Sequence, residues 1–229
     1  MAEGAPALTP PVERRLYLLR HAETEALDAR GHMRSADPIP LTERGVVQAE
    51  ALGQLFADVP VTAVHASPLD RTAHTARLVA GPGRAVRLHP GLKEISLGDY
   101  DGAHSSEIFA AAPGWLADPD AALPGGESLN EVADRAVAAL DAIIAESDER
   151  ELVLVAHGGV NRGLIARLIG LRMDLAHRIR QDWASVNVLD LAEGRWWPGV
   201  LNLTPFGVEE IPIARGAFID AKAMGRIGR

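Results

Sequence analysis

Three short apolar runs, each followed by a polar turn and a helix-like segment, constrain the fold of this chain more than any other feature. The runs cover residues 15–19, 61–66 and 151–156. An uninterrupted apolar run of this length is typical of a strand that is buried on both faces. Strands that alternate with helices form a largely parallel sheet with helices on both faces. We therefore predict an α/β fold, a three-layer sandwich with a mostly parallel central sheet flanked by helices.

The remaining segments predict the other elements of this alternation. Thr42 and Ser128 are residue types that begin helices as N-caps. Helices are expected at about 42–58, 70–80, 104–111, 128–147 and 160–170, and further strands at about 85–88, 184–191 and 195–203. The apolar stripe expected on the first helix consists of Val46, Val47, Ala49, Leu52, Leu55 and Phe56.

The domain organisation follows from where this periodicity begins and ends. Residues 1–13 hold three prolines and predict a flexible leader. Residues 14–204 predict one domain, in which a stretch rich in Gly, Pro and Asp at about 99–127 forms a short cap insertion. Residues 205–229 show weak periodicity and predict an exposed C-terminal tail.

Composition narrows the class of protein. The 229 residues are 47% apolar and 24% charged, which is ordinary for a folded globular chain. The net charge of −8 is unlike that of most proteins that bind nucleic acid or anionic membranes, so neither partner is expected. Neither a membrane span nor a secretory signal is predicted, and a cytoplasmic location is therefore the default expectation. The absence of cysteine excludes disulfides, thiolate metal sites and cysteine nucleophiles.

Polar residues follow three of the predicted strands at the point where each strand ends. Arg20 and His21 follow the first run, Arg71 comes one turn after the second, and His157 follows the third. In open α/β sheets the ligand site lies beyond the carboxyl ends of the strands. Two arginines and two histidines gathered there would repel one another unless an anion bound between them. Guanidinium groups match phosphate, and a helix that begins at Gly158 adds free N–H groups.

A phosphate bound in this way is open to attack by an imidazole, because histidine offers a lone pair at neutral pH without a dedicated base. The positive groups would stabilise charge on the transferring oxygens. The leaving alkoxide needs a proton, and Glu94, on a Gly-rich loop that can fold over the site, is the predicted donor.

At this point the sequence resembles the histidine phosphatase superfamily, also called the phosphoglycerate mutase-like family. Six blocks occur in the family's order and together span about residues 15–165. The blocks are RHAET at 20–24, PLTERG at 40–45, SPLDRTAHTA at 67–76, EISLGDYDG at 94–102, PGGES at 124–128 and VAHGG at 155–159.

The resemblance implies a role for each matching position. His21 is implied to be the nucleophile that forms a phosphohistidine, and Glu94 the proton donor that later activates water. The groups implied to bind the phosphoryl group are Arg20, Arg71, His157, Thr24 and the Gly158 amide. The resemblance implies neither a metal ion nor another cofactor. Correspondingly, His21 and His157 lack a third ligand at a spacing that would complete a metal site.

Two positions depart from the family's pattern, and a third has two readings. Ala22 replaces the usual glycine after the nucleophile, which matters only if this residue needs a positive φ. Leu27 stands where many members have a phosphate-binding asparagine, so it reduces the donor set and opens an apolar wall for substrate. Glu127 either contacts the substrate or serves only as a carboxylate at a helix start.

The motifs are shared by phosphatases and mutases, so the length of the cap must separate them. Glu94 and His157 are 63 positions apart. Phosphoglycerate mutases carry a longer insertion there, which keeps water from the phosphoenzyme. The shorter segment favours a phosphoric monoester hydrolase of the histidine acid phosphatase type that acts on a small phosphorylated metabolite. Phe109, Trp115 and Leu116 are expected to form an apolar lip for the organic part of that substrate.

Two other functions stay open at this stage, a phosphoglycerate mutase and an inactive relative that binds a phospholigand. The presence of His21, Glu94 and both arginines argues against the inactive relative, whereas Leu27 favours it. Three tryptophans are expected in the core or on a sheet face, with a homodimer contact as the alternative; they are Trp183, Trp196 and Trp197.

Overall fold

A mixed sheet lies at the centre of the computed structural model, which describes residues 11–205 apart from 113, 116 and 117. In that part of the chain six strands pair in the order β3-β2-β4-β1-β5-β6. They are β1 (Arg14–Arg20), β2 (Ala63–Ala66), β3 (Ala85–Leu88), β4 (Glu151–Ala156), β5 (Val186–Ala192) and β6 (Arg195–Leu203). Strands β1 to β4 run parallel, β5 is antiparallel to β1, and β6 is antiparallel to β5. The predicted mostly parallel sheet is confirmed.

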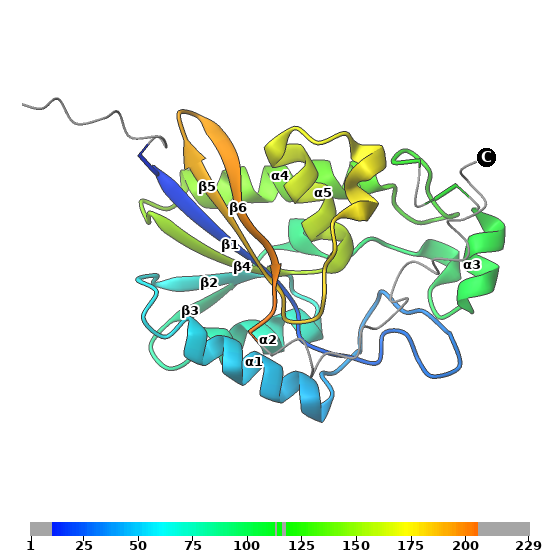
Figure 1. Ribbon diagram of the computed structural model, residues 1–229. Coiled ribbons are helices and arrows are strands. Elements are labelled where there is room, and N and C mark those ends of the chain that lie inside the picture. Colours follow the sequence, from blue (N-terminus) through cyan, green and yellow to red (C-terminus); the bar gives the residue numbers. More distant parts are fainter. Residues whose placement is uncertain (1–10, 113, 116–117, 206–229) are drawn as a thin grey trace, which may run out of the picture.

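Helices cover both faces of this sheet (Figure 1). On one side lie α1 (Glu43–Leu55) and α2 (Asp70–Ala80), and on the other lie α4 (Leu129–Ala145) and α5 (Gly158–Ile169). The helix α3 (Ser105–Ala111) lies beyond the edge of the sheet among long loops. Three short 3₁₀ helices complete the elements: η1 (Pro90–Leu92), η2 (Gly98–Tyr100) and η3 (Met173–Arg178).

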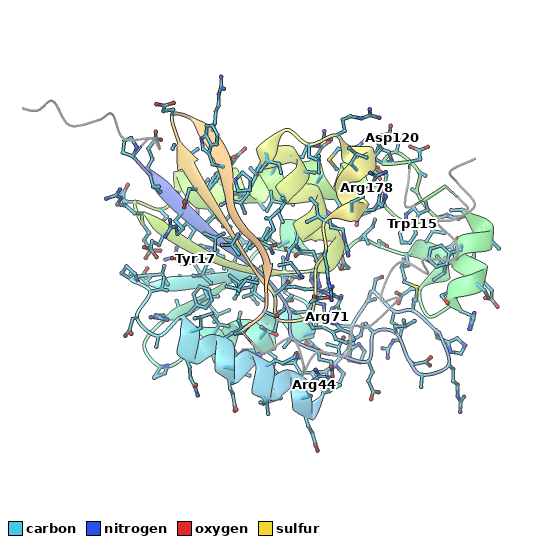
Figure 2. All side chains as sticks on the ribbon, viewed as in Figure 1. Tyr17, Arg44, Arg71, Trp115, Asp120 and Arg178 are labelled. Carbon is cyan, nitrogen blue, oxygen red and sulfur yellow. The ribbon has the colours of Figure 1, made fainter. Side chains whose placement is uncertain are left out.

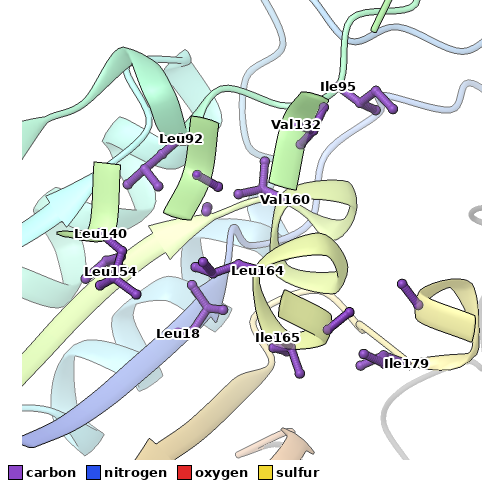
Figure 3. Packing of buried hydrophobic residues seen from close by; sticks show 14 of the residues in the cluster. Leu18, Leu92, Ile95, Val132, Leu140, Leu154, Val160, Leu164, Ile165 and Ile179 are labelled. Atoms are coloured by element: carbon purple, nitrogen blue, oxygen red, sulfur yellow. The ribbon is translucent and has the colours of Figure 1, made fainter. Parts of the chain in front are cut away.

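Alternation along the central strands divides the core into two layers. Leu16 and Leu18 of β1 pack in the cluster beneath α4 and α5, whereas Leu19 packs in the cluster beneath α1 and α2. Leu154 and Val155 of β4 divide in the same way, because successive side chains of a strand point to opposite faces. Figure 3 shows the first of these clusters, with Leu18 and Leu154 of the sheet facing Leu164 of α5.

The helix starts follow the capping residues. The Thr42 hydroxyl accepts a hydrogen bond from the Gly45 amide at 3.0 Å and begins α1. Ser128 and Glu131 form a reciprocal capping box at the start of α4, with distances of 2.8 and 3.2 Å. Each such cap satisfies N–H groups that have no partner within the helix.

The apolar stripe predicted for α1 is partly wrong. Val47 and Leu55 are 61% and 51% exposed, whereas Gln48 is buried beside Ala49 and Leu52. The Gln48 side-chain oxygen accepts the Glu23 amide at 2.9 Å, and a Cβ at residue 45 would collide with the Glu23 carbonyl oxygen. This close approach to the loop after β1 determines which side of α1 is buried.

The predicted leader and tail lie almost entirely outside the described residues. At the leader's end the Glu13 amide already donates to the Leu191 carbonyl at 2.8 Å, so pairing with the sheet begins one residue before β1. No helix in the described ranges is long and apolar enough to cross a membrane.

Candidate active site

The predicted meeting of polar residues at one edge of the sheet follows from the strand order. Because β2, β4 and β1 are parallel neighbours, their carboxyl ends lie side by side. His21 follows β1, and His157 follows β4 as the N-cap residue of α5. The ring centroids of these two histidines are 5.2 Å apart. Figure 2 shows Arg71, from the start of α2, near the same ends of the central strands.

The His21 ring is buried and held in one orientation. Its Nδ1 lies 2.8 Å from the Ala22 carbonyl oxygen, so Nδ1 carries the proton and donates it there. The lone pair of the neutral ring is then on Nε2. Burial lowers the pKa of His21 well below its ordinary value, and the charges of Arg20 and Arg71 lower it further. Without a ligand, the ring is therefore neutral and nucleophilic at neutral pH.

The Arg20 guanidinium lies between the strand that carries it and the segment before β5. Its Nη1 donates to the Gln181 carbonyl at 2.7 Å, and its Cζ lies 5.5 Å from the ring centroid of Trp183. Burial lowers the pKa of Arg20 to about 10, and the charge of Arg162 adds to this effect. The side chain remains charged at neutral pH in a dry setting, where its attraction for an anion is strong.

Arg71 is buried beneath the loop that follows β1. Its Nη2 donates to the Ser35 carbonyl at 2.9 Å, and its Nη1 lies 3.4 Å from an Asp37 carboxylate oxygen. Burial lowers the pKa of Arg71, whereas the charges of Glu94 and Asp37 oppose that change. These contacts fix the guanidinium plane and leave its Nε without a partner among the described residues.

The second histidine is held by a serine from the neighbouring strand end. His157 Nε2 lies 2.9 Å from the Ser67 hydroxyl oxygen, which also accepts the Leu69 amide at 3.3 Å. We infer that the serine hydroxyl donates to Nε2, because the histidine then keeps its proton on Nδ1, the ring nitrogen that has no partner among the described residues. Burial lowers the pKa of His157 well below its ordinary value, with the charge of Arg71 as the next cause.

Three buried nitrogen atoms on these side chains lack a hydrogen-bond partner among the described residues. They are the Nε atoms of Arg20 and Arg71 and the Nδ1 atom of His157. Unpartnered buried donors are costly and rare in folded proteins. Arg20 and Arg71 line the same pocket as His21, and the His157 ring lies 5.2 Å from the His21 ring, so these three donors suit an oxyanion.

Glu94 approaches the same site from the loop after η1. Its Oε2 accepts the Gly159 amide at 3.3 Å, and its Oε1 accepts the Ile95 amide at 2.9 Å. A Cβ at residue 159 would lie 2.5 Å from Glu94 Oε1, so a glycine is needed for this approach. The carboxyl group is therefore fixed at the N-terminus of α5.

A pocket opens at this edge and encloses about 510 Å³, including the space at its mouth. The described residues that line it are Arg20, His21, Ala26, Leu27, Met33, Arg34, Ser35, Arg71, Glu94, Ile95, Leu97 and Trp183. No group of three or more His, Asp or Glu side chains within the described ranges is arranged to hold a metal ion.

Comparison with known proteins agrees with this geometry. The family profile for the histidine phosphatase superfamily (branch 1) matches residues 16–204. The chain belongs to the histidine phosphatase superfamily. It is 36% identical to the adenosylcobalamin/alpha-ribazole phosphatase of Salmonella typhimurium over 82% of this chain and 96% of that protein. It is also 31% identical to a probable phosphoglycerate mutase of Cronobacter sakazakii, over 79% of this chain and 86% of the relative.

Solved structures show the same likeness in three dimensions. The mycobacterial glucosyl-3-phosphoglycerate phosphatase superposes with a TM-score of 0.75 at 31% identity, over 82% of this chain and 98% of that one. This protein therefore has the phosphoglycerate mutase-like fold of the superfamily.

Glu127 does not line the pocket of this histidine phosphatase superfamily member. Its two carboxylate oxygens each accept a hydrogen bond from Arg135 at 2.8 Å. Burial acts to raise the pKa of Glu127, but the bonds from Arg135 and the Ser96 amide outweigh burial and lower it. Arg135 also donates to the carbonyl groups of Gly91 (2.8 Å), Lys93 (2.7 Å) and Glu94 (3.1 Å). Glu127 and Arg135 thus clamp the loop that carries Glu94.

Three further positions singled out in the sequence, Thr24, Gly158 and Ala22, can be compared with the structure. Thr24 is buried, but its hydroxyl accepts the Ala26 amide at 3.3 Å and does not line the pocket. Gly158 begins α5, where an added Cβ would lie 3.1 Å from Arg162 Nη1 and 3.5 Å from Arg20 Nε. Ala22 is buried without a positive φ, so alanine is accommodated in place of glycine.

The apolar side of the pocket differs from the prediction. Leu27 lines it, as expected from its position in the sequence. Trp115 is packed in the core beneath the cap, and Figure 2 shows it beside α3, away from Arg71. Phe109 is absent from the lining, and Leu116 lies outside the described residues. The lip predicted from the cap is therefore wrong for Trp115 and Phe109.

Trp183 is a pocket residue that the sequence did not reveal. It was expected in the core or on a sheet face, where Trp196 and Trp197 of β6 do lie. Only the direction of a neighbouring strand indicates that Trp183 reaches the pocket. Strand β5 is antiparallel to β1, so the residues before β5 lie at the edge where β1 ends.

Proposed function

We propose that this protein is a metal-independent phosphomonoesterase that hydrolyses a small phosphorylated metabolite through a phosphohistidine intermediate on His21. One observation carries the proposal. A neutral, buried histidine with a free Nε2 lines a pocket, and the side chains near it carry three unpartnered buried donors. This arrangement suits a phosphoryl group and its transition state.

The first chemical step forms a bond from His21 Nε2 to phosphorus and breaks the bond from phosphorus to the ester oxygen. Arg20, Arg71 and His157 stabilise the negative charge on the three remaining oxygens. The leaving alkoxide takes a proton from the Glu94 carboxyl group, which the Gly159 amide holds at this end of α5.

The second step returns the enzyme to its starting state. The Glu94 carboxylate takes a proton from water as the water oxygen attacks phosphorus. The bond from phosphorus to His21 breaks, and inorganic phosphate leaves. Because none of the described residues of the cap at 99–127 lines the pocket, water can reach the phosphoenzyme, which supports hydrolysis.

The names of similar proteins support the same reaction. The relatives from Salmonella typhimurium and from mycobacteria are named as phosphatases of alpha-ribazole and glucosyl-3-phosphoglycerate compounds. A phosphoglycerate mutase is the second candidate, because the relative from Cronobacter sakazakii carries that name. Faster isomerisation than hydrolysis of 3-phosphoglycerate would select the mutase.

The proposal is tested by hydrolysis of para-nitrophenyl phosphate in the presence of a chelator. We expect turnover by the native protein, and a loss of about a thousand-fold or more in His21→Ala. His74→Ala is the matched control, because His74 is exposed on α2. A requirement for added metal, or full activity in His21→Ala, would overturn the mechanism. No turnover of any phosphomonoester would favour an inactive phospholigand-binding relative.

A further inference from the structure

The pocket has two chemically different parts. Arg20, His21, Arg71 and Glu94 form the reacting end. Most of the remaining described lining consists of apolar side chains, and these are Ala26, Leu27, Met33, Ile95 and Leu97. Met33, Ile95 and Leu97 belong to the core cluster, and Leu27 packs against it, so this wall is part of the rigid interior.

The polar side chains near this wall already have partners. The Ser35 amide and hydroxyl both donate to one Asp101 carboxylate oxygen, at 2.5 and 2.8 Å, and the Ser35 carbonyl accepts from Arg71. The exposed Arg34 donates to the Pro38 carbonyl at 2.7 Å. Along the apolar wall itself, a polyhydroxylated substrate would therefore lose hydrogen bonds with water without gaining equivalent bonds, and only the exposed Arg34 at its edge keeps free N–H donors.

Trp183 provides the exception among the described lining residues outside the reacting end. Its indole Nε1 is buried and has no hydrogen-bond partner in the described part of the chain. An indole N–H is a donor only, so its partner must be an acceptor atom. The Arg20 guanidinium lies over the Trp183 ring, with its Cζ atom 5.5 Å from the ring centroid.

The backbone holds this tryptophan in place. The Ser185 amide donates to the Asp182 carbonyl at 3.1 Å, which closes a tight turn around Trp183 and Ala184. Ala184 has a φ of +54°, a region that disfavours residues other than glycine, and its amide donates to the His21 carbonyl at 3.1 Å. The turn therefore ties Trp183 directly to the backbone of the nucleophile.

We propose that the organic part of the substrate is uncharged and apolar, an aryl or alkyl group with one acceptor atom that binds the Trp183 indole N–H. Leu27, Met33 and Leu97 contact the apolar part, and Trp183 is the specificity-determining residue for the acceptor. This inference rests on the proposed function and names its substrate class.

The first test compares phosphate esters of primary alcohols with similar leaving groups. We expect kcat/KM for 3-phenylpropyl phosphate to exceed that for glycerol 1-phosphate by about ten-fold or more, because moving a phenyl ring from water to an apolar wall is favourable. Equal or better turnover of glycerol 1-phosphate or 3-phosphoglycerate would overturn the apolar class. Equal or better turnover of 3-phosphoglycerate would also indicate that Arg34 binds the substrate carboxylate.

The second test isolates the indole N–H. In 2-phenoxyethyl phosphate an ether oxygen replaces one methylene of 3-phenylpropyl phosphate. We expect the native protein to prefer the ether by about five-fold and Trp183→Phe to lose that preference while retaining the preference for phenyl over glycerol. Trp196→Phe on β6 is the matched control and should retain both. An equal loss for both aryl esters in Trp183→Phe would place the N–H at the phosphoryl group and overturn the acceptor role.

Non-hydrolysable phosphonates separate this inference from the proposed function. Calorimetry of native protein would compare 4-phenylbutylphosphonate with 3,4-dihydroxybutylphosphonate. Tighter binding of the phenyl compound by a protein that hydrolyses no ester would support the apolar site and overturn the phosphatase. Equal binding of the two phosphonates by an active phosphatase would overturn the apolar site alone.

Discussion

The Nε2 atom of His157 lies 2.9 Å from the hydroxyl oxygen of Ser67, and both residues directly follow neighbouring strands. A serine proton donated in this bond leaves the His157 proton on Nδ1, where it can donate to a phosphoryl oxygen. We expect Ser67→Ala to weaken inhibition by orthovanadate about ten-fold, because one hydrogen bond to a charged ligand loses its alignment.

Ser106 provides a matched control, because its hydroxyl lies 2.7 Å from the Nδ1 atom of a half-buried histidine, His104, and neither residue lines the pocket. Orthovanadate should inhibit Ser106→Ala as strongly as it inhibits the native protein. Unchanged vanadate affinity in Ser67→Ala would show that Ser67 does not set the tautomer of His157.

The clamp formed by Arg135 and Glu127 gives a second prediction. Arg135→Met removes three bonds to the loop that carries Glu94. The hydrolysis rate of an alkyl phosphate should fall by about ten- to hundred-fold, because its alkoxide needs the proton from Glu94. The rate for para-nitrophenyl phosphate should fall much less, since nitrophenolate leaves without a proton.

The control for this variant is Arg167→Met, which removes a partly exposed pair with Asp134 at 2.9 Å. It should reduce neither rate. Equal losses for both substrates in Arg135→Met would indicate a general structural defect instead of a misplaced proton donor.

Gly159 gives a third prediction, because an added Cβ would lie 2.5 Å from Glu94 Oε1. Gly159→Ala should displace the carboxyl group and lower kcat for alkyl phosphates about ten-fold or more. Gly199→Ala is the matched control, since a Cβ there meets Val188 at an ordinary 3.5 Å. A native kcat in Gly159→Ala would exclude a role for the close approach of Glu94 to α5.

Stability should depend on pH because burial lowers the pKa of His21 and His157 well below the ordinary value. In the unfolded chain these groups bind protons below about pH 6.5. The unfolded state then holds more protons than the folded state, so the free energy of unfolding decreases as the pH falls below about 6.5. Burial also lowers the pKa of His65, to about 4, which acts in the same direction.

Urea unfolding between pH 7.5 and 5 measures this effect. The native protein should lose stability across that range, and His21→Gln should show a shallower dependence. Inorganic phosphate should reduce the loss, because an anion favours protonated histidines in the folded state. A pH-independent free energy of unfolding would contradict the lowered pKa values.

Much of the fold was accessible from local sequence, for a physical reason. The apolar runs that became β1, β2 and β4 need burial on both faces, so a parallel sheet between helix layers is their stable arrangement. The same argument brings His21, Arg71 and His157 to one edge, because parallel neighbours end together.

The rest depends on pairing between distant segments, which a local pattern does not encode. Trp183 reaches the pocket because β5 runs antiparallel to β1, whereas a parallel β5 would carry the residues before it to the opposite edge. Glu127 belongs to the clamp because Arg135, two turns later on α4, faces it. Val47 and Leu55 are exposed because the buried side of α1 is set by the loop after β1.

The proposed mechanism requires that His21 carries the phosphoryl group during turnover. Rapid acid-free quenching during hydrolysis of a ³²P-labelled phosphomonoester, with a chelator present, tests it most directly. We expect an alkali-stable, acid-labile label on the peptide that contains His21, and no label in His21→Ala. A label on another residue, or turnover by His21→Ala at the native rate, would contradict it.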